Sequence, residues 1–430
     1  MKGILSVNET RLTRYLYRLL ILFPITTVLQ NAIFENLNKI LFACIFCLLI
    51  KIHYINKKIS NKEIIVCFFL ILNYIYALLK TKFPLVSIND LFYMPFLVIY
   101  AMFFTEEKKY LINYFRKDKR YIITIIQVWT VIVAISAFLP SSYKHDWGGA
   151  LYFCSFAGSV FRLAPSALMI LVLIVAYFAV YKERIIILYT FVPMFCMYMG
   201  GSRTYLGIGL LTFIIIWYMY CSKPKYFYIS IVPILIFAIL MIFHTAAADK
   251  IAATTYTSNS YLDYWATITN GRSIFWNFDL NSFKNENIVN KLLGCGFNYV
   301  YEINLKYFNK AIWAHNDFIN ILLNYGVVGI VLYSYSIYCF FKIMLKNRSN
   351  VPVILKILFF FIWFINAMFN MFYTYFCSMI SFPILILFVT KYFTTQKSTF
   401  RRVIRKKPRN TVKIRRKKSP GVTRMISKTL

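Results

Sequence analysis

Charged residues are scarce in this chain. Asp, Glu, Lys and Arg make up 15% of the 430 residues, whereas 60% are hydrophobic. Soluble globular domains carry about 25% charged residues, because water must wet their surface. The scarcity of charge excludes a soluble globular protein and predicts an integral membrane protein. At about 20 residues per helical span the chain is long enough for many spans, which excludes a single-pass anchor.

Several motifs of familiar chemistry are also missing. The sequence has no Gly-rich loop ending in Gly-Lys-Ser/Thr and no Gly-x-Ser-x-Gly elbow, so ATP-driven and serine-hydrolase chemistry are unsupported. The four histidines are scattered, and none has a second ligand at metal-binding spacing. We therefore expect no metal and no cofactor. The middle of nearly every apolar run lacks charged residues, which weakens the case for an ion-coupled carrier.

Acidic residues are few compared with basic ones. There are 15 Asp and Glu against 49 Lys and Arg, a formal charge of +34. Fifteen of the basic residues lie in 391–430, which contains no Asp or Glu. Most of the others lie in short segments between apolar runs, as expected for loops that basic residues hold in the cytoplasm. The charge thus indicates membrane topology and an anionic lipid surface, not nucleic acid.

The apolar runs predict an all-α polytopic membrane protein with about twelve transmembrane helices. With both termini in the cytoplasm, 36 basic residues lie inside and 12 outside. We expect a transmembrane domain over 1–393 and a basic cytoplasmic tail over 394–430 that is disordered or bound to anionic lipid. The runs lie near 15–34, 38–55, 63–79, 89–104, 121–139, 162–180, 185–200, 203–220, 226–244, 318–341, 353–373 and 376–393.

Two longer loops are expected on the outer side of the membrane, and extracytoplasmic chemistry should be sought there. One spans about 140–161, and the larger one, 245–317, joins the ninth and tenth helices. Aromatic and apolar residues between 261 and 278 recur at near-helical spacing in the larger loop. This spacing is typical of helices that lie flat at the interface.

Two arginines open predicted spans from the outer side. Ser202 is placed to cap the helix that follows Gly201, and Arg203 then sits at a helix N-terminus, where backbone N–H groups already favour an anion. Arg162 lies ahead of Pro165 in a similar position. Each arginine is a candidate phosphate ligand. The alternative is an interfacial arginine that reaches lipid headgroups.

Further candidates lie in the large loop. Arg272 precedes Trp276 by four residues, so on a helix the two share one face. They form either a cation–π pair or an arginine held toward a ligand phosphate. Gly294 and Gly296 flank Cys295 and indicate a tight backbone turn.

His315 opens the tenth span from the outside and is the strongest candidate. Its unperturbed pKa suits a general base near neutral pH. Asn316, Asn320 and Asn324 follow at four-residue spacing and form a polar stripe on one helix face. Such a stripe should face a wet cavity or other helices, and the alternative is hydrogen bonding between helices. The opposite wall is expected from Trp363, Asn366 and Asn370.

These motifs, in this order, resemble the bacterial O-antigen polymerase and O-antigen ligase family of polytopic membrane glycosyltransferases. The resemblance covers about 160–345, and the flanks of Arg162 depart from the family pattern. The motifs are Gly-Ser-Arg at 201–203, Gly-Arg with Trp at 271, 272 and 276, Gly-Cys-Gly-Phe at 294–297, and His-Asn-x-Phe followed by Tyr-Gly-x-x-Gly at 315–329.

The resemblance implies a metal-independent enzyme of the bacterial cytoplasmic (inner) membrane, with a GT-C-like architecture. It would take an undecaprenyl-pyrophosphate-linked oligosaccharide as donor and transfer the glycan to an acceptor hydroxyl on the outer side. Arg203 and Arg272 would clamp the pyrophosphate, with Arg162 as a third candidate, and His315 would accept the proton. Asn316 and Asn320 would orient His315 or the sugars, and Ser202 and Trp276 would contribute to substrate binding.

The resemblance leaves the acceptor open. We favour a polymerase of O-antigen or capsule, whose acceptor is another lipid-linked repeat unit and which works with a chain-length regulator. A ligase, whose acceptor is lipid A core, is the first alternative. A lipid-linked oligosaccharide flippase or carrier is the second, although it would need a cationic cavity through the whole membrane. A non-catalytic assembly partner is the third.

Overall fold

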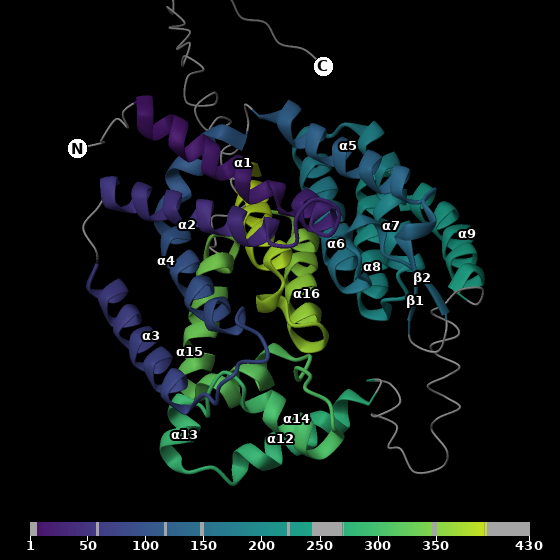
Figure 1. Ribbon diagram of the computed structural model, residues 1–430. Coiled ribbons are helices and arrows are strands. Elements are labelled where there is room, and N and C mark those ends of the chain that lie inside the picture. Colours follow the sequence, from purple (N-terminus) through teal and green to yellow (C-terminus); the bar gives the residue numbers. More distant parts are fainter. Residues whose placement is uncertain are drawn as a thin grey trace, which may run out of the picture.

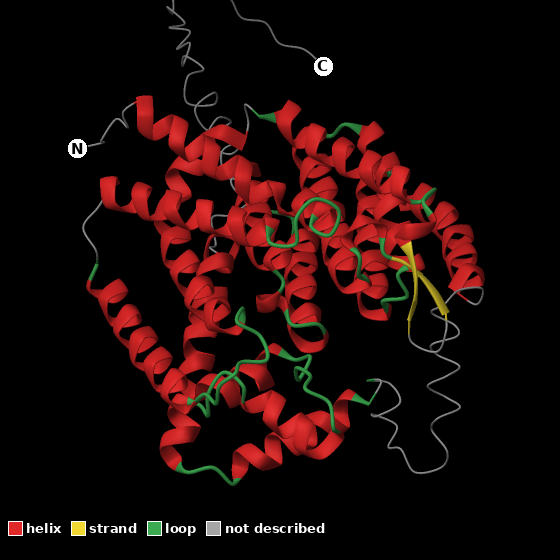
Figure 2. Ribbon diagram, viewed as in Figure 1, coloured by secondary structure: helices red, strands yellow, loops and turns green. Residues whose placement is uncertain are grey.

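A computed structural model describes residues 7–56, 60–115, 118–146, 150–221, 224–242, 269, 271–345, 351–390 and 392–393. The expected basic tail, 394–430, and the stretch 245–268 of the expected outer loop lie outside the described residues. Within them the structure is helical except for one small β-hairpin (Figure 2). The predicted all-α class is therefore confirmed at this coarse level.

The first part of the chain forms helices that overlap the predicted apolar runs, although α1 begins eight residues before its run and α4 ends eleven residues after its run. Lys182 ends the central helix, α6, in a left-handed conformation. The elements are α1 (Val7–Leu29), α2 (Leu37–Asn56), α3 (Asn61–Lys80), α4 (Asp90–Phe115), α5 (Lys119–Ser136), α6 (Val160–Tyr181), the 3₁₀ helix η3 (Arg184–Thr190), α7 (Phe191–Met199), α8 (Arg203–Tyr220) and α9 (Pro224–Ile242).

The second part continues with three short helices and two long ones. They are α12 (Arg272–Lys284), α13 (Ile288–Leu293), α14 (Tyr299–Phe308), α15 (Asp317–Leu345) and α16 (Val353–Phe369), followed by the 3₁₀ turn η4 (Phe372–Thr374) and the π-helical turn η5 (Cys377–Ser381). A last helix continues from η5 to Thr390. Figure 1 shows α12, α13 and α14 as a layer at one end of the bundle, next to α15 and α16.

The outer loop expected at 140–161 contains regular structure that its sequence did not predict. Strand β1 (Tyr143–Asp146) pairs antiparallel with β2 (Ala150–Phe153), so that Tyr143 lies opposite Phe153. Short 3₁₀ turns flank the hairpin, η1 (Pro140–Ser142) and η2 (Ser155–Ala157). The hairpin packs against α7 and so lies beside the Gly-Ser-Arg turn.

Helix α6 is the core of the molecule because it is apolar on every side. Every residue from Leu163 to Val180 is buried, and α1, α5, α7 and α8 pack around it. A helix with no polar stripe is stable only when other helices or lipid cover it. The hydroxyl of Ser166 is one polar exception. It accepts a hydrogen bond from the Trp129 indole N–H and donates one to the Pro24 carbonyl, both at 2.8 Å.

Five helices are long and apolar enough to cross a membrane: Asn61–Lys80, Lys119–Ser136, Val160–Tyr181, Arg203–Tyr220 and Asp317–Lys342. Four shorter apolar helices coincide with further predicted runs, at Asp90–Met102, Arg184–Met199, Val353–Phe369 and Cys377–Thr390. The structure thus indicates a multi-pass membrane protein, and the expected count of about twelve spans stays a prediction.

Helix α3 shows the surface that such a protein presents to lipid. An exposed apolar surface of this extent is unstable in water and suits the bilayer interior. At the N-terminus of α3, Ser60 and Glu63 form a reciprocal capping box. The exposed apolar side chains are Ile64, Ile65, Phe68, Phe69, Ile71, Leu72, Ile75, Leu78 and Leu79.

Candidate functional site

His315 lies in an irregular segment, 309–316, that joins α14 to α15. Its backbone is left-handed, with φ 52°, and its imidazole is half-buried. Two hydrogen bonds to main-chain carbonyls hold the segment: the Trp276 indole N–H donates to Ala314 at 2.7 Å, and the Asn304 amide donates to Ile312 at 3.0 Å. The histidine is therefore placed by its neighbours and not by a regular helix.

The His315 imidazole is neutral over the physiological pH range. Burial lowers its pKa to about 4, and the positive charge of Arg272 contributes to the decrease. A neutral imidazole can accept a proton, as a general base must. The charge of Arg272 therefore acts on His315, although 43 residues separate the two in the sequence.

Arg272 is the first residue of α12, and its guanidinium interacts with groups from distant parts of the chain. Its guanidinium donates a hydrogen bond to the Phe369 carbonyl at the end of α16. Burial lowers the pKa of Arg272, the Tyr375 and Tyr205 hydroxyls raise it, and the positive charge of Arg203 lowers it again. The charge of Arg272 is therefore within electrostatic range of both Arg203 and His315, which come from two other segments of the chain.

Arg203 is the first residue of α8 and is half-buried. The turn before it requires glycine, because Gly201 has φ +60° and a Cβ there would lie 2.6 Å from the Tyr152 ring. Ser202 occupies the N-cap position, but its side chain makes no capping hydrogen bond. The expectation that Ser202 caps this helix is therefore wrong. Its ψ of 92° belongs to an extended residue that leaves the Gly201 turn.

Arg162 lies in the first turn of α6, which Ser159 caps by accepting from the Phe161 N–H at 3.2 Å. Its Nη2 atom is 3.7 Å from Oε1 of the exposed Glu35. Arg162 also lines a cavity of about 210 Å³ whose polar wall contains a second cation, Lys39. The remaining lining residues are Thr27, Gln30, Asn38, Asn89, Tyr93, Pro165, Trp313, Thr374, Tyr375, Phe376 and Cys377.

Tyr375 connects this cavity with the cluster of Arg203, Arg272 and His315. It lines the cavity, and its hydroxyl lies near enough to Arg272 to raise the pKa of that guanidinium. Trp313, two residues before His315, lines the cavity as well. The four predicted cationic or basic residues, including Arg162, thus gather in one region of the molecule.

The asparagine stripe serves contacts within the chain. Asn316 caps α15, with its Oδ1 accepting from the Ile319 N–H at 3.1 Å. The Asn320 amide donates to the Tyr373 hydroxyl at 2.5 Å, and Asn324 Oδ1 accepts from the Val300 N–H at 3.3 Å. These contacts agree with the alternative interpretation, hydrogen bonding between elements. No described contact of Asn316 or Asn320 joins it to His315.

Trp276 makes contacts that its sequence position did not predict. Its N–H is used on the Ala314 carbonyl, and its ring centroid is 6.1 Å from that of Phe369. Since Arg272 donates to the Phe369 carbonyl, the two residues contact the same end of α16. Trp276 therefore positions the His315 segment.

No protein-family model matches this chain, and no curated protein matches it in sequence.

Asp317 is a residue of the site that sequence reasoning did not select. It is fully buried, and its Oδ2 accepts from the Tyr333 hydroxyl at 2.6 Å and from the Tyr373 N–H at 3.3 Å. Its Oδ1 has no hydrogen-bond partner within the described part of the chain. The available signal was an acidic residue that opens an apolar helix two positions after a histidine.

The two glycine motifs meet each other. Gly294 and Gly296 have φ +95° and +108°, which confirms the predicted tight turn. A Cβ on Gly294 would lie 2.2 Å from the Asn324 carbonyl oxygen, and one on Gly326 would lie 2.5 Å from the Gly294 nitrogen. Asn73 of α3 donates to the Leu293 and Tyr325 carbonyls at 2.9 and 2.7 Å. Close backbone contact thus joins the α13 turn to α15.

Proposed function

We propose that this chain is a metal-independent membrane glycosyltransferase that polymerises a lipid-linked glycan. The observation that carries the proposal is the convergence of Arg203, Arg272 and His315 from three separate segments. Two guanidinium groups recognise a pyrophosphate, and a neutral imidazole beside them accepts a proton. The resemblance to O-antigen polymerases supports the same roles.

The reaction follows from these roles. An acceptor hydroxyl attacks the anomeric carbon of the donor, the new glycosidic C–O bond forms, and the bond from that carbon to the pyrophosphate oxygen breaks. His315 accepts the hydroxyl proton, and undecaprenyl pyrophosphate leaves. Arg272 has N–H donors beyond the one used on Phe369, so it stabilises the negative charge of the leaving group together with Arg203.

A bound donor also changes the pKa of the proposed base, His315. In the free protein the charge of Arg272 helps to lower the pKa of His315. A bound pyrophosphate offsets that charge and so raises the pKa of the imidazole in the complex, where the proton must be accepted. Arg162 and Lys39, in the neighbouring cavity, provide further positive charge for the lipid pyrophosphate or the first sugar.

The proposal includes a membrane topology. About twelve spans in the bacterial cytoplasmic membrane, with both termini inside, would place α12–α14 and His315 on the outer side. The excess of basic residues in the alternate loops supports this arrangement. A cysteine introduced at Asn285, an exposed residue directly after α12, should react with a membrane-impermeant maleimide added outside intact spheroplasts. Labelling only after lysis would contradict the topology.

Purified protein in nanodiscs with one undecaprenyl-pyrophosphate-linked repeat unit, EDTA and no ATP tests the activity. We expect a ladder of longer products. Arg203→Lys keeps the charge but loses the bidentate fork, and should slow the ladder about 100-fold. Arg120→Lys, at an exposed position in the first turn of α5, is the matched control. Transfer only after lipid A core is added would indicate a ligase, and no transfer at all would favour the carrier.

A further inference from the structure

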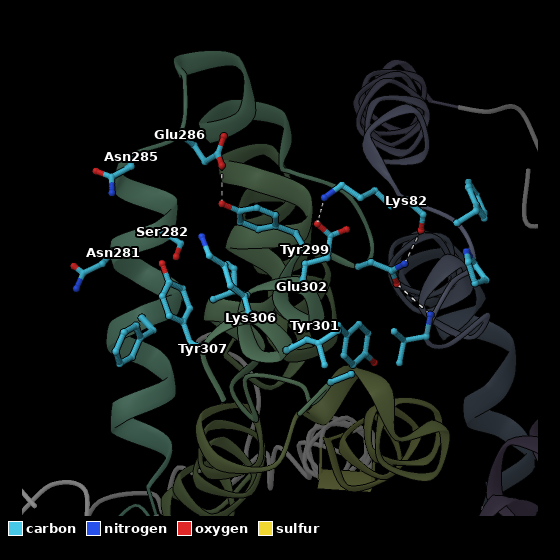
Figure 3. A pocket seen from close by; sticks show the side chains of 18 residues that line it. Lys82, Asn281, Ser282, Asn285, Glu286, Tyr299, Tyr301, Glu302, Lys306 and Tyr307 are labelled. Carbon is cyan, nitrogen blue, oxygen red and sulfur yellow. Dashed lines mark hydrogen bonds and ion pairs between the residues drawn. The ribbon is translucent and has the colours of Figure 1, made fainter. Parts of the chain in front are cut away.

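A large groove lies in the layer of α12, α13 and α14 (Figure 3), and none of Arg162, Arg203, Arg272 and His315 lines it. Its volume is about 860 Å³, within the range of small-molecule sites. Helices α12 and α14 and the segment 82–86, which joins α3 to α4, form its walls. The lining residues are Lys82, Phe83, Pro84, Val86, Phe278, Asn281, Ser282, Asn285, Glu286, Asn298, Tyr299, Tyr301, Glu302, Ile303, Leu305, Lys306, Tyr307 and Ala311.

Both helices direct a regular face into the groove. From α12 and its C-cap these residues are Phe278, Asn281, Ser282 and Asn285, and from α14 they are Tyr299, Glu302, Ile303 and Lys306. Each set has the spacing i, i+3, i+4 and i+7, which lies on one side of a helix. In an ordinary packed pair these faces would be apolar. Here they are mostly polar or aromatic, as in a binding surface.

Hydrogen bonds fix the walls in place. Asn298 holds the segment 82–86, since its amide donates to the Lys82 carbonyl at 2.8 Å and its Oδ1 accepts from the Val86 N–H at 3.4 Å. Glu286 accepts from the Tyr299 hydroxyl at 2.6 Å, which Figure 3 shows as a dashed line. Lys82 and Glu302 form an ion pair at 2.6 Å. The groove is therefore preformed.

The charge of the groove differs from that of the chain. Its lining contains two lysines and two glutamates, which cancel, whereas the whole chain carries +34. A site for pyrophosphate or an anionic headgroup would keep its cations free, but here Lys82 is paired with Glu302. This balance favours an uncharged ligand.

The side chains of the groove match the chemistry of neutral sugars. A pyranose has an apolar C–H face, which packs on aromatic rings, and the groove provides Phe83, Phe278 and Tyr307. Sugar hydroxyls both donate and accept, and so do amides. Among the described residues, the side chains of Asn281, Ser282 and Asn285 make no hydrogen bonds of their own. In Figure 3 Ser282 lies beside Lys306 and Tyr307, and Asn281 and Asn285 extend from the other side of α12.

The groove is continuous with the segment that carries His315. Ala311 lines the groove, and Trp313 lines the Arg162 cavity. The ring of Tyr301, another lining residue, is 6.3 Å from the ring of Trp313. His315 follows two residues later. The segment that carries His315 thus borders the groove at Ala311.

We propose that this groove binds a run of neutral sugar residues of the glycan substrate. The side chains that line the groove are the evidence that it binds sugars. That these sugars belong to the glycan that the enzyme transfers rests on the proposed function. The bound sugars belong either to the single repeat unit or to the longer lipid-linked chain.

Direct binding tests the groove independently of activity. The probe is the oligosaccharide released by mild acid from the lipid-linked glycans of the producing cell, titrated into wild-type protein in nanodiscs and followed by calorimetry. Asn281→Ala and Asn285→Ala should each weaken binding about fivefold, equivalent to about 1 kcal/mol for one hydrogen bond. Asn277→Ala, an exposed α12 asparagine outside the lining, is the matched control and should bind like wild type.

Transfer assays then identify the source of the sugars. Slower extension of a supplied longer chain by the Asn281→Ala/Asn285→Ala double variant, with dimer formation unchanged, assigns the groove to the long chain. If the double variant slows both chain extension and dimer formation, the groove binds the single repeat unit. If wild-type protein makes a ladder but binds no free oligosaccharide, the proposal that the groove binds sugars is wrong and the proposed polymerase activity stands. If wild-type protein binds the oligosaccharide, the double variant does not, and no ladder forms, the proposed polymerase activity is wrong and the sugar-binding groove stands.

Discussion

The indole N–H of Trp276 donates a hydrogen bond to the main-chain carbonyl of Ala314, at 2.7 Å. Trp276 lies one turn after Arg272 on α12, and Ala314 directly precedes His315. This single bond therefore ties the helix that carries the guanidinium to the segment that carries the imidazole. The relative position of the two groups depends on it, because the His315 segment has no helical backbone of its own.

Replacing Trp276 by phenylalanine keeps a ring and removes the donor. The Ala314 carbonyl is then left without this partner in a buried position, which costs about 1–3 kcal/mol. We expect a transfer rate about tenfold lower at saturating donor, since small displacements of catalytic groups are costly. Trp217→Phe removes a comparable bond, to Ser230 at 2.7 Å, near the other end of α8 from Arg203. Equal losses of activity in both variants would contradict a positioning role for Trp276.

The acid limb of the pH–rate profile reports the pKa of His315. Because burial and Arg272 lower that pKa to about 4, the imidazole stays a competent base as the pH falls from 8 to 5. We expect kcat/KM to be constant over this range and to decrease below about pH 4. An acid limb with its midpoint near 6.5 would mean that the free enzyme's base is an ordinary exposed histidine.

Arg272→Gln provides the companion measurement. Removing the positive charge removes one cause of the lowered His315 pKa, so the remaining activity should show an acid limb at higher pH than wild type. The direction of the shift separates the electrostatic effect of Arg272 from its role on the donor, which lowers the rate at every pH. An unchanged midpoint would contradict the electrostatic influence of Arg272 on His315.

The long helices could be predicted from the sequence because apolar runs report them directly. The run at 203–220 coincides with α8, and that at 162–180 differs from α6 by at most two residues at either end. Arg203, Arg272 and His315 could be selected singly, since each opens a helix or precedes one. Sequence order and resemblance suggested one site, and the structure brings Arg203 and His315 each within electrostatic range of Arg272.

Features that depend on tertiary contacts could not be predicted. The bonds of Asn298 to Lys82 and Val86 join positions more than 200 residues apart, and no local periodicity reports them. The groove between α12, α14 and the segment 82–86 therefore has no signature in the sequence. Similarly, a stripe of asparagines looks the same whether it lines water or bonds to Tyr373, and only the packing of α16 and η4 decides.

Asp279 of α12 should make stability depend on pH. It is fully buried, and its two carboxylate oxygens have no hydrogen-bond partner among the described residues. Burial raises its pKa from 3.8 to about 7. The folded state then binds a proton between about pH 4 and 7 that the unfolded state has lost, so stability falls as pH rises through this range. The difference corresponds to about 4 kcal/mol at most.

Asp279→Asn removes this titration. The variant should be more stable than wild type at pH 8 and close to it at pH 4, as measured by thermal unfolding in nanodiscs. Glu286→Gln is the comparison with opposite sign, because hydrogen bonds from Tyr299 and Asn290 lower the pKa of Glu286 and the charged form is stabilising. A wild-type stability that does not change between pH 5 and 8 would contradict the burial of an unpaired carboxyl.

The contact between Gly294 and Gly326 should tolerate no side chain. At Gly294 an added Cβ meets the Asn324 backbone at 2.2 Å, and at Gly326 it meets the Gly294 nitrogen at 2.5 Å; both residues have positive φ. Backbone atoms cannot move aside as side chains do, so alanine at either position should cost about 2–4 kcal/mol. Gly207→Ala in α8 is the matched control, because its Cβ meets nothing within 4 Å and alanine favours a helix by up to about 1 kcal/mol. Thermal unfolding should therefore rank Gly207→Ala at or above wild type and the other two well below it. The contact joins the α13 turn to α15, the helix that begins after His315. Gly294→Ala should therefore also slow transfer at temperatures where it remains folded.

Wild-type stability in Gly294→Ala would mean that the turn and α15 are not in backbone contact. The layer of α12, α13 and α14 would then lack the support that places His315.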